Sequence, residues 1–373
     1  MSKSFSKSGH RPDYTFLSCV VLLVIFGLVM LSSASSDLGK NKFNDTYYYL
    51  RHQILYGLSF GIVGFLIASR LHYRYWQKIA TLLLIINVIA LILVFTPLGV
   101  PHGQAKRWLD IGPISIQPSE LLKFVFMVYL AAWLASRGKS DNRQKKFFTG
   151  YLPFLAICGL VGFLVFSQPS TTTTGIILFS ALLVYFASGA KLRYILLTII
   201  LGVAGVYMLL NVTKDYRLER LINFMQQETN LQTKGFHLNQ SLIAIGSGGW
   251  FGVGFGKSIA KSTYLPEPIG DSIFAVIAEE LGFIGVLVLM AIFLVLIIRG
   301  LSIAKNSRDQ FARLAVIGFI SVIAIQTAIH LAANSGLMPL TGVPLPFISY
   351  GGSSLAVFLT MAGAIGNISK YTS

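Results

Sequence analysis

Long apolar runs constrain the fold of this chain more than any other feature. Backbone amides cannot stay unpaired in hydrocarbon, so a segment that crosses a membrane must be a helix or a strand of a closed barrel. The apolar runs are continuous rather than alternating, which favours helices. Each is close to the roughly 20 residues that a spanning helix needs. We expect ten spans, at about 14–34, 52–70, 78–97, 118–136, 150–168, 174–190, 193–211, 271–298, 312–334 and 350–368.

Composition agrees with an all-α polytopic membrane protein that forms one integral membrane domain over residues 1–373. Hydrophobic residues make up 54% of the chain and charged residues only 12%, whereas about a quarter of a soluble domain is charged. Lys and Arg number 30 against 14 Asp and Glu. In a soluble protein this excess would suggest nucleic acid, but here it indicates orientation, and we expect no nucleic-acid partner. Cys19 and Cys158 stand alone in apolar runs and predict neither a disulfide nor a metal site.

The basic residues predict which side of the membrane each loop occupies. Eighteen Lys and Arg fall on the segments at one side and six on the short loops and span ends at the other. Positive charge is retained in the cytoplasm, so we expect both termini there, including a tail at 1–13. An extracytoplasmic loop is then expected at 212–270, between the seventh and eighth spans. It is too long to be a mere connector, and long loops of this kind usually carry function.

One group of charges precedes and enters the fourth span. Lys106 and Arg107 lie before it, and Glu120 and Lys123 share one face of its first turns. Glu120 and Lys123 can neutralise each other, which would make the span tolerable in the membrane. Alternatively, the three cations can converge on an anionic lipid head group, because fixed cations at a low-dielectric surface suit that ligand. The residues leave both interpretations open.

A second group of polar residues surrounds the start of the eighth span. Asp271 follows two prolines and a glycine, and Asp is a preferred helix N-cap. A carboxylate at a helix amino end also stays ionised at neutral pH, as a general base must. Glu279 and Glu280 come two turns later and point about 100° apart on a helix, so at least one should face the bundle interior. The structural interpretation of both glutamates is a buried, hydrogen-bonded acid.

The segment before the last span is irregular. Residues 337–354 hold three prolines and three glycines. Such backbone is tolerated at membrane depth only where it lines a protein cavity, although a plain re-entrant turn would explain it nearly as well. His237 and His330 are isolated, and no metal-ligand spacing is visible.

Five motifs, taken in order, resemble the SEDS family, which comprises FtsW, RodA and SpoVE. The loop from Phe236 to Leu265 resembles FtsW more than RodA. The motifs span nearly the whole chain, and they stand at 103–108 (Gly-Gln-Ala-Lys-Arg-Trp), 117–120 (Gln-Pro-Ser-Glu), 240–249, 264–282 (Tyr-Leu-Pro-Glu, Asp271 and Glu-Glu-Leu-Gly) and 342–354.

The resemblance implies a peptidoglycan glycosyltransferase that polymerises lipid II at the outer face of the bacterial cytoplasmic membrane, in cell division or elongation. It implies a class B penicillin-binding protein and other divisome or elongasome membrane proteins as partners. Asp271 would take the proton from the acceptor hydroxyl. A divalent cation, Mg²⁺ or Mn²⁺, can assist at the pyrophosphate, and no organic cofactor is expected. The residues expected to bind substrate are Lys106, Arg107, Trp108, Glu120, Lys123, Arg217, Arg220, Gln240, Ser247, Lys261, Glu267, Ser349 and Ser353.

The chain departs from the family pattern at three places. Ile269 and Gly270 stand where His and Thr commonly precede the aspartate, residues 170–173 lack the usual acid and glycine, and His330 replaces a polar residue that is often Asn. These changes affect local tuning and packing rather than the proposed base. Two other functions remain open from the sequence: a lipid II flippase or transporter, and a non-catalytic scaffold for a penicillin-binding protein.

Overall fold

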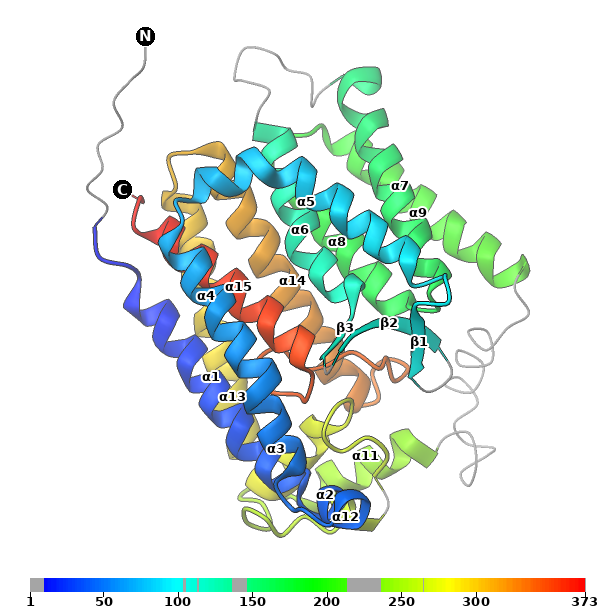
Figure 1. Cartoon of the computed structure of the whole chain (residues 1–373), viewed down its shortest axis with the longest axis vertical. Helices are drawn as coiled ribbons and strands as arrows, with labels where there is room; N and C mark the ends of the chain where they lie inside the picture. Colours follow the sequence, from blue (N-terminus) through cyan, green and yellow to red (C-terminus); the bar gives the residue numbers. More distant parts are fainter. Residues whose placement is uncertain are drawn as a thin grey trace.

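The chain folds into a helical bundle with a small sheet at one end (Figure 1). The computed structural model describes residues 10–102, 105–112, 114–135, 146–212, 236–263 and 265–372. The helices are α1 Tyr14–Ala34, α2 Ser36–Phe43, α3 Tyr48–His52, α4 Ser59–Arg70, α5 Tyr73–Leu93, α6 Pro118–Ala135, α7 Leu152–Ser167, α8 Thr171–Ala187, α9 Leu192–Val212, α11 Phe236–Ser247, α12 Ala260–Thr263, α13 Ile273–Asn306, α14 Gln310–Asn334 and α15 Gly352–Ser369. Two π-helical segments, η1 Gln53–Leu58 and η3 Phe147–Tyr151, join α3 to α4 and lead into α7.

The predicted class, an all-α polytopic membrane protein, is confirmed. Within the described residues, eight helices are long and apolar enough to cross a membrane: Tyr14–Ala34, Tyr48–Arg70, Tyr73–Leu93, Pro118–Ala135, Phe147–Ser167, Ile273–Asn306, Gln310–Asn334 and Gly352–Ser369. Helices α8 and α9 occupy the two remaining predicted positions, but their described apolar stretches are shorter. The count of ten spans therefore stays a prediction.

A three-stranded antiparallel sheet between α5 and α6 was not predicted. Its strands are β1 Gly99–His102, β2 Ala105–Ile111 and β3 Ile114–Ile116, in the order β1-β2-β3. The sequence carries a signal for part of it: apolar and polar residues alternate from Leu109 to Ile116, and a Gly-Pro pair interrupts them. The sheet holds three of the predicted site residues, Lys106, Arg107 and Trp108, on β2.

The two described ends of the chain meet at one end of the bundle. The His10 amide donates to the Lys370 carbonyl at 2.9 Å, and the Arg299 guanidinium pairs with Asp13 at 2.6 Å. We call this the terminal end. The opposite end carries α2, the sheet, α11, α12 and residues 335–351 (Figure 1). We call it the site end, and we call residues 335–351 the rim segment.

Helix α13 breaks at Gly282, whose φ of 66° and ψ of −170° are not helical. A break frees backbone groups that hydrocarbon cannot satisfy. Residues 248–259, which we call the glycine loop, supply the missing partners. Two α13 amides donate to the loop and two loop amides donate to α13, through the bonds Phe283 N to Gly249 O, Ile284 N to Trp250 O, Val253 N to Glu279 O and Gly254 N to Glu280 O, at 2.9–3.1 Å.

Replacing Gly282 by Ala should destabilise the protein severely. Its φ is left-handed, and a Cβ there would lie 2.3 Å from the Gly252 amide nitrogen, so backbone would have to move. We expect the free energy of unfolding in mixed micelles to fall by more than about 2 kcal/mol. Gly175 is the matched control, because it lies on the exposed face of α8 with nothing within 4 Å of its Cβ position. Gly175→Ala should be neutral or stabilising by up to about 1 kcal/mol, and equal losses in the two variants would contradict the argument.

Candidate functional site

Asp271 lies at the site end, directly before α13. The helix begins at Ile273 with Ser272 as its N-cap residue, so the prediction that Asp271 caps the helix is wrong by one position. The two prolines and the glycine before it form the turn that displaces the cap: the amides of Gly270 and Ser272 both donate to the Glu267 carbonyl, and Glu267 has a φ of 47°. The carboxylate is half-buried.

Three side chains or amides from other elements hold the backbone around Asp271. Asn334, the last residue of α14, donates through Nδ2 to the Asp271 carbonyl at 2.8 Å. The Ser349 hydroxyl donates to the Gly270 carbonyl at 2.8 Å, and the Tyr350 amide donates to the Ile269 carbonyl at 2.9 Å. Each bond satisfies a backbone acceptor, so the segment that carries the carboxylate is fixed from two sides.

The rim segment packs directly against the carboxylate. A Cβ at Gly342 would lie 3.3 Å from Asp271 Oδ2, so the absence of a side chain gives the carboxylate its space. Two α14 side chains anchor the residues that follow: Gln326 Nε2 donates to the Pro344 carbonyl at 2.7 Å, and His330 Nδ1 donates to the Val343 carbonyl at 2.8 Å. The departure at His330 thus has a structural role, and it supports the rim segment beside Asp271.

Gly342→Ala should reduce the activity of the site with a modest loss of stability. The residue has a φ of 63°, which costs about 1–2 kcal/mol for a side chain, and its new methyl group would press on the carboxylate. We expect turnover to fall at least about tenfold, since small misplacements of catalytic groups are costly. Gly112→Ala, in the turn between β2 and β3, has the same φ strain with nothing within 4 Å of the Cβ position. Equal turnover in the two variants would show that strain alone is responsible.

Glu120 and Lys123 form the predicted neutralising pair. Lys123 Nζ lies 2.5 Å from Glu120 Oε1 and donates to Gln326 Oε1 at 2.7 Å, and both charged side chains are buried. The ammonium is therefore bonded inside the bundle, where it joins α6 to α14 and, through Gln326, to the rim segment. This arrangement supports the self-neutralising interpretation. The alternative, that Lys123 or Glu120 contacts a head group, stays a prediction.

The other two cations of the first group lie on β2 with different surroundings. Arg107 donates through Nε to the Gln168 carbonyl at 2.9 Å and through its terminal nitrogen to the Pro169 carbonyl. These two carbonyls, which directly precede the departure at 170–173, tie the sheet to the start of α8. Lys106 is exposed. Trp108 is half-buried and pairs with Val100 across the sheet.

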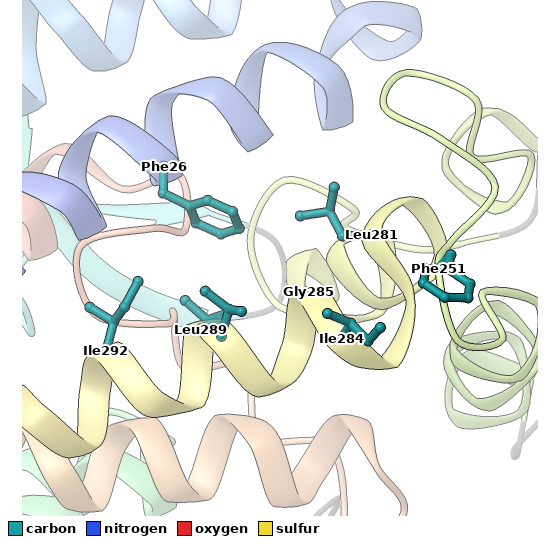
Figure 2. A pocket seen from close by; sticks show the side chains of 8 residues that line it. Phe26, Phe251, Leu281, Ile284, Gly285, Leu289 and Ile292 are labelled. Carbon is teal, nitrogen blue, oxygen red and sulfur yellow. The ribbon is translucent and has the colours of Figure 1, made fainter.

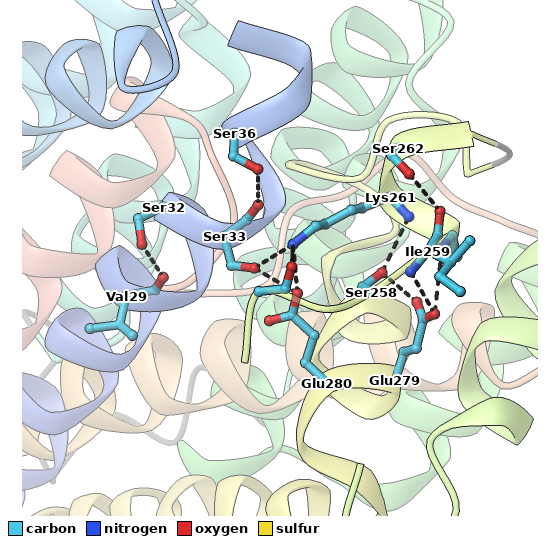
Figure 3. Close-up of polar contacts among 12 residues, drawn as sticks. Val29, Ser32, Ser33, Ser36, Ser258, Ile259, Lys261, Ser262, Glu279 and Glu280 are labelled. Atoms are coloured by element: carbon cyan, nitrogen blue, oxygen red, sulfur yellow. Dashed lines mark hydrogen bonds and ion pairs between the residues drawn. The ribbon is translucent and has the colours of Figure 1, made fainter. Parts of the chain in front are cut away.

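Glu279, Glu280 and Lys261 form a buried network near the break in α13 (Figure 3). Lys261 Nζ donates to Glu280 Oε1 at 2.9 Å and to Ser33 Oγ of α1 at 2.8 Å. The Glu279 carboxylate accepts from the Ser258 hydroxyl and from the amide of Ile259 at 3.0 Å. Both glutamates are buried, which confirms that at least one faces the interior. Lys261 pairs with Glu280, and its expected role in substrate binding stays a prediction.

The remaining predicted residues are more dispersed. Ser353 accepts from the Gln117 amide at 3.4 Å and donates to the Ser115 carbonyl at 3.2 Å, so it joins α15 to the sheet. Gln240 is half-buried, and Ser247 and Glu267 are exposed. Arg217 and Arg220 lie outside the described residues. No group of three His, Cys, Asp or Glu side chains that could hold a metal ion occurs within the described part of the chain.

Sequence reasoning missed an aromatic contact at the site end. The Tyr350 hydroxyl donates to or accepts from His52 Nδ1 at 2.9 Å, and Tyr49 packs edge-on against Tyr350 at 5.4 Å between ring centroids. Burial raises the pKa of Tyr350 to about 12, so its phenol is neutral at every physiological pH. Asn334, Gln326 and Gly342 were also missed. Asn334 and Gln326 could have been found from the sequence, because each is a polar residue within an apolar span.

Comparison with known proteins gives consistent results along the whole chain. A family model described as cell cycle protein, for FtsW, RodA and SpoVE, matches residues 13–373. Stage V sporulation protein E of Bacillus subtilis (strain 168) is 34% identical over 97% of this chain and 98% of its own length. A protein of Geobacter sulfurreducens (strain DL-1 / KN400), named probable peptidoglycan glycosyltransferase FtsW, is 37% identical over 97% of this chain and 96% of its own.

Solved structures share the fold. A chain of a peptidoglycan synthase complex matches with a TM-score of 0.82 at 25% identity, over 97% of this chain and 99% of that one. The rod shape determining protein RodA of Thermus thermophilus matches with a TM-score of 0.70 at 26% identity, over 96% of both chains.

Proposed function

Because the chain belongs to the FtsW, RodA and SpoVE family of cell cycle proteins, we propose that it is a peptidoglycan glycosyltransferase that polymerises lipid II. The observation that carries the proposal for the reaction is the position of Asp271. Its half-buried carboxylate stands at the site end on a backbone held by Asn334 and Ser349, and Gly342 leaves room beside it. The relatives named probable peptidoglycan glycosyltransferase FtsW support the reaction class.

The reaction joins the sugar hydroxyl of one lipid-linked saccharide to the anomeric carbon of another. The hydroxyl oxygen forms the new glycosidic bond, its proton passes to the Asp271 carboxylate, and the bond to the lipid pyrophosphate breaks. A positioned general base contributes typically 10²–10⁴-fold to such a step. The fixed backbone around Asp271 supports this role, since the carboxylate does not have to be oriented again in each cycle.

The departing pyrophosphate needs positive charge. Lys106 is the strongest candidate among the described residues, because it is exposed on β2 at the site end. Arg107 offers a second cation, although two carbonyls already accept from it. We propose Arg217 and Arg220 as further candidates from the sequence alone. A divalent cation, Mg²⁺ or Mn²⁺, could share this task and would supply Lewis-acid charge there. If a divalent cation takes part, removal of divalent ions with a chelator should reduce polymer formation.

The distribution of basic residues supports an assignment of each end of the bundle to one side of the membrane. Among the described residues, twelve Lys and Arg lie at the terminal end, on both chain ends and the links α4–α5, η3, α8–α9 and α13–α14, and seven lie at the site end, on α2, α3, the sheet, the glycine loop and α12. Because cytoplasmic loops are enriched in Lys and Arg, we propose that both termini are cytoplasmic and that Asp271 faces the outside. A class B penicillin-binding protein is the proposed partner, since a structural neighbour is a chain of a peptidoglycan synthase complex.

One assay separates this function from its two rivals. The purified chain is incubated with labelled lipid II, with and without a class B penicillin-binding protein, and the products are resolved by length. Polymer that depends on this chain supports the proposal. Lipid II that crosses a liposome membrane without polymer would support a flippase. Polymer made by the partner alone, and unchanged by this chain, would support a scaffold.

A further inference from the structure

The glycine loop, residues 248–259, exposes large apolar side chains at the site end of the bundle. Trp250 is 66% exposed and Phe251 is 81% exposed, and Phe255 and Ile259 of the same loop are exposed as well. A protein surface in water seldom shows so much contiguous apolar area without a partner. The question is therefore which partner covers this loop.

The outer edge of the hydrocarbon can be located along α13. After Glu280 the helix has no charged residue until Arg299, which pairs with Asp13 at the terminal end. At 1.5 Å per residue, the uncharged stretch of 281–298 is about 27 Å long, close to the roughly 30 Å of a bilayer core. The hydrocarbon edge thus falls at the break in α13, between Glu280 and Phe283.

Helix α1 independently places the hydrocarbon edge at the same depth. It has no charged residue, and after Ser18 it is apolar until Ser32 and Ser33 near its end at Ala34. Ser33 donates to Glu280 Oε1 at 2.6 Å, so the polar end of α1 and the polar end of the uncharged α13 stretch lie side by side. Two helices with separate sequences therefore mark one boundary.

The glycine loop is attached at this boundary. Its backbone pairs with residues 279–284 of α13, as described above. The Trp250 ring meets Phe283 edge-on at 5.3 Å between centroids. Phe251 joins Phe26 of α1 and Leu281, Ile284 and Leu289 of α13 around an apolar groove of about 340 Å³ (Figure 2). The exposed loop side chains thus continue the outward-facing apolar surface of α13, on which Phe283, Ile284 and Val288 are exposed.

We propose that the glycine loop is a membrane-contact element, and that Trp250 and Phe251 lie in the outer leaflet at the boundary between acyl chains and head groups. The occupant of this surface is lipid. Three observations support this: the loop is bonded at the hydrocarbon edge, its aromatic surface is continuous with a membrane-spanning helix, and Trp is the residue type that favours this depth. The loop backbone can lie there because its amides and carbonyls pair with the broken helix. The proposal does not depend on the enzymatic function.

Tryptophan fluorescence tests the proposal directly. The chain has four tryptophans, so the full-length variant with Trp76→Phe, Trp108→Phe and Trp133→Phe reports on Trp250 alone. It is reconstituted without a partner into liposomes of phosphatidylcholine and phosphatidylglycerol. We expect brominated acyl chains to quench the emission at least about twofold, with bromine near the glycerol more effective than bromine near the bilayer centre, and aqueous iodide to quench it weakly. Adding Trp250→Phe to this variant is the blank.

Either of two results would overturn the proposal. Strong iodide quenching without bromolipid quenching would place Trp250 in water, and protection from both quenchers would indicate that protein covers the loop. If the triple variant does not fold, Trp250→Cys with a nitroxide label serves instead, because Cys19 and Cys158 are both buried. Collisions with oxygen should then exceed collisions with a water-soluble nickel chelate, and the reverse order would again exclude lipid contact.

Discussion

Asp271→Asn should abolish glycan polymerisation while leaving the protein folded and able to bind lipid II. The amide keeps the shape of the carboxylate but cannot accept the proton of the acceptor hydroxyl. Because a general base contributes typically 10²–10⁴-fold, we expect polymer formation to fall at least about 100-fold. The backbone bonds from Asn334, Ser349 and Tyr350 all reach carbonyls, so they survive the substitution. Polymer yield and lipid II binding are measured on the same purified complex with the penicillin-binding partner.

The matched control for this variant is Asp110→Asn. Asp110 is an exposed carboxylate on β2 at the same end of the bundle, and it accepts from the Ser115 hydroxyl at 2.6 Å, which an amide oxygen can also do. Its polymer yield should stay within about twofold of the wild type, since surface substitutions rarely matter. Wild-type yield from Asp271→Asn would remove that residue from the role of base. Loss of lipid II binding in the same variant would instead assign it to substrate recognition.

Breaking the buried pair of Lys261 and Glu280 should cause the largest loss of stability. Both side chains are at most 4% exposed, and they join α12 to α13 and, through Ser33, to α1. Lys261→Met leaves the Glu280 carboxylate charged and buried without its cation, which costs typically about 3–5 kcal/mol. The free energy of unfolding in mixed micelles measures this loss.

The double variant Lys261→Met with Glu280→Gln decides whether the unpaired charge causes the loss. It removes both charges, so it should recover at least about half of the stability lost by Lys261→Met. The pair of Arg51 and Asp45 is the comparison at the surface, with the arginine side chain 68% exposed. Arg51→Met should cost less than about 1 kcal/mol. A double variant no more stable than Lys261→Met would show that packing, rather than charge, is lost.

Much of the candidate site could be predicted from local sequence, but the role of each charge could not. A charged residue in an apolar run predicts that a partner or a task exists, because isolated charge in hydrocarbon is costly. The sequence does not say which partner. Glu120 and Lys123 are three residues apart, and their pairing was one of two predicted outcomes. Lys261 on α12 and Glu280 on α13 are 19 residues apart, and their pairing depends on how α12 folds back against α13.

The fold class and the order of the apolar helices can be predicted from the amino-acid sequence, because hydrocarbon requires continuous apolar segments. The family follows from short motifs, which are also local. The surroundings of Asp271, in contrast, depend on packing. Gly342, Asn334 and Ser349 reach Asp271 from 63 to 78 positions away in the chain. Contacts between residues so far apart in the chain depend on how the helices pack and on where a helix breaks, as α13 does at Gly282. The local composition of a segment predicts neither of these features. Side-chain spacing is local, whereas a site is made by segments that only packing brings together.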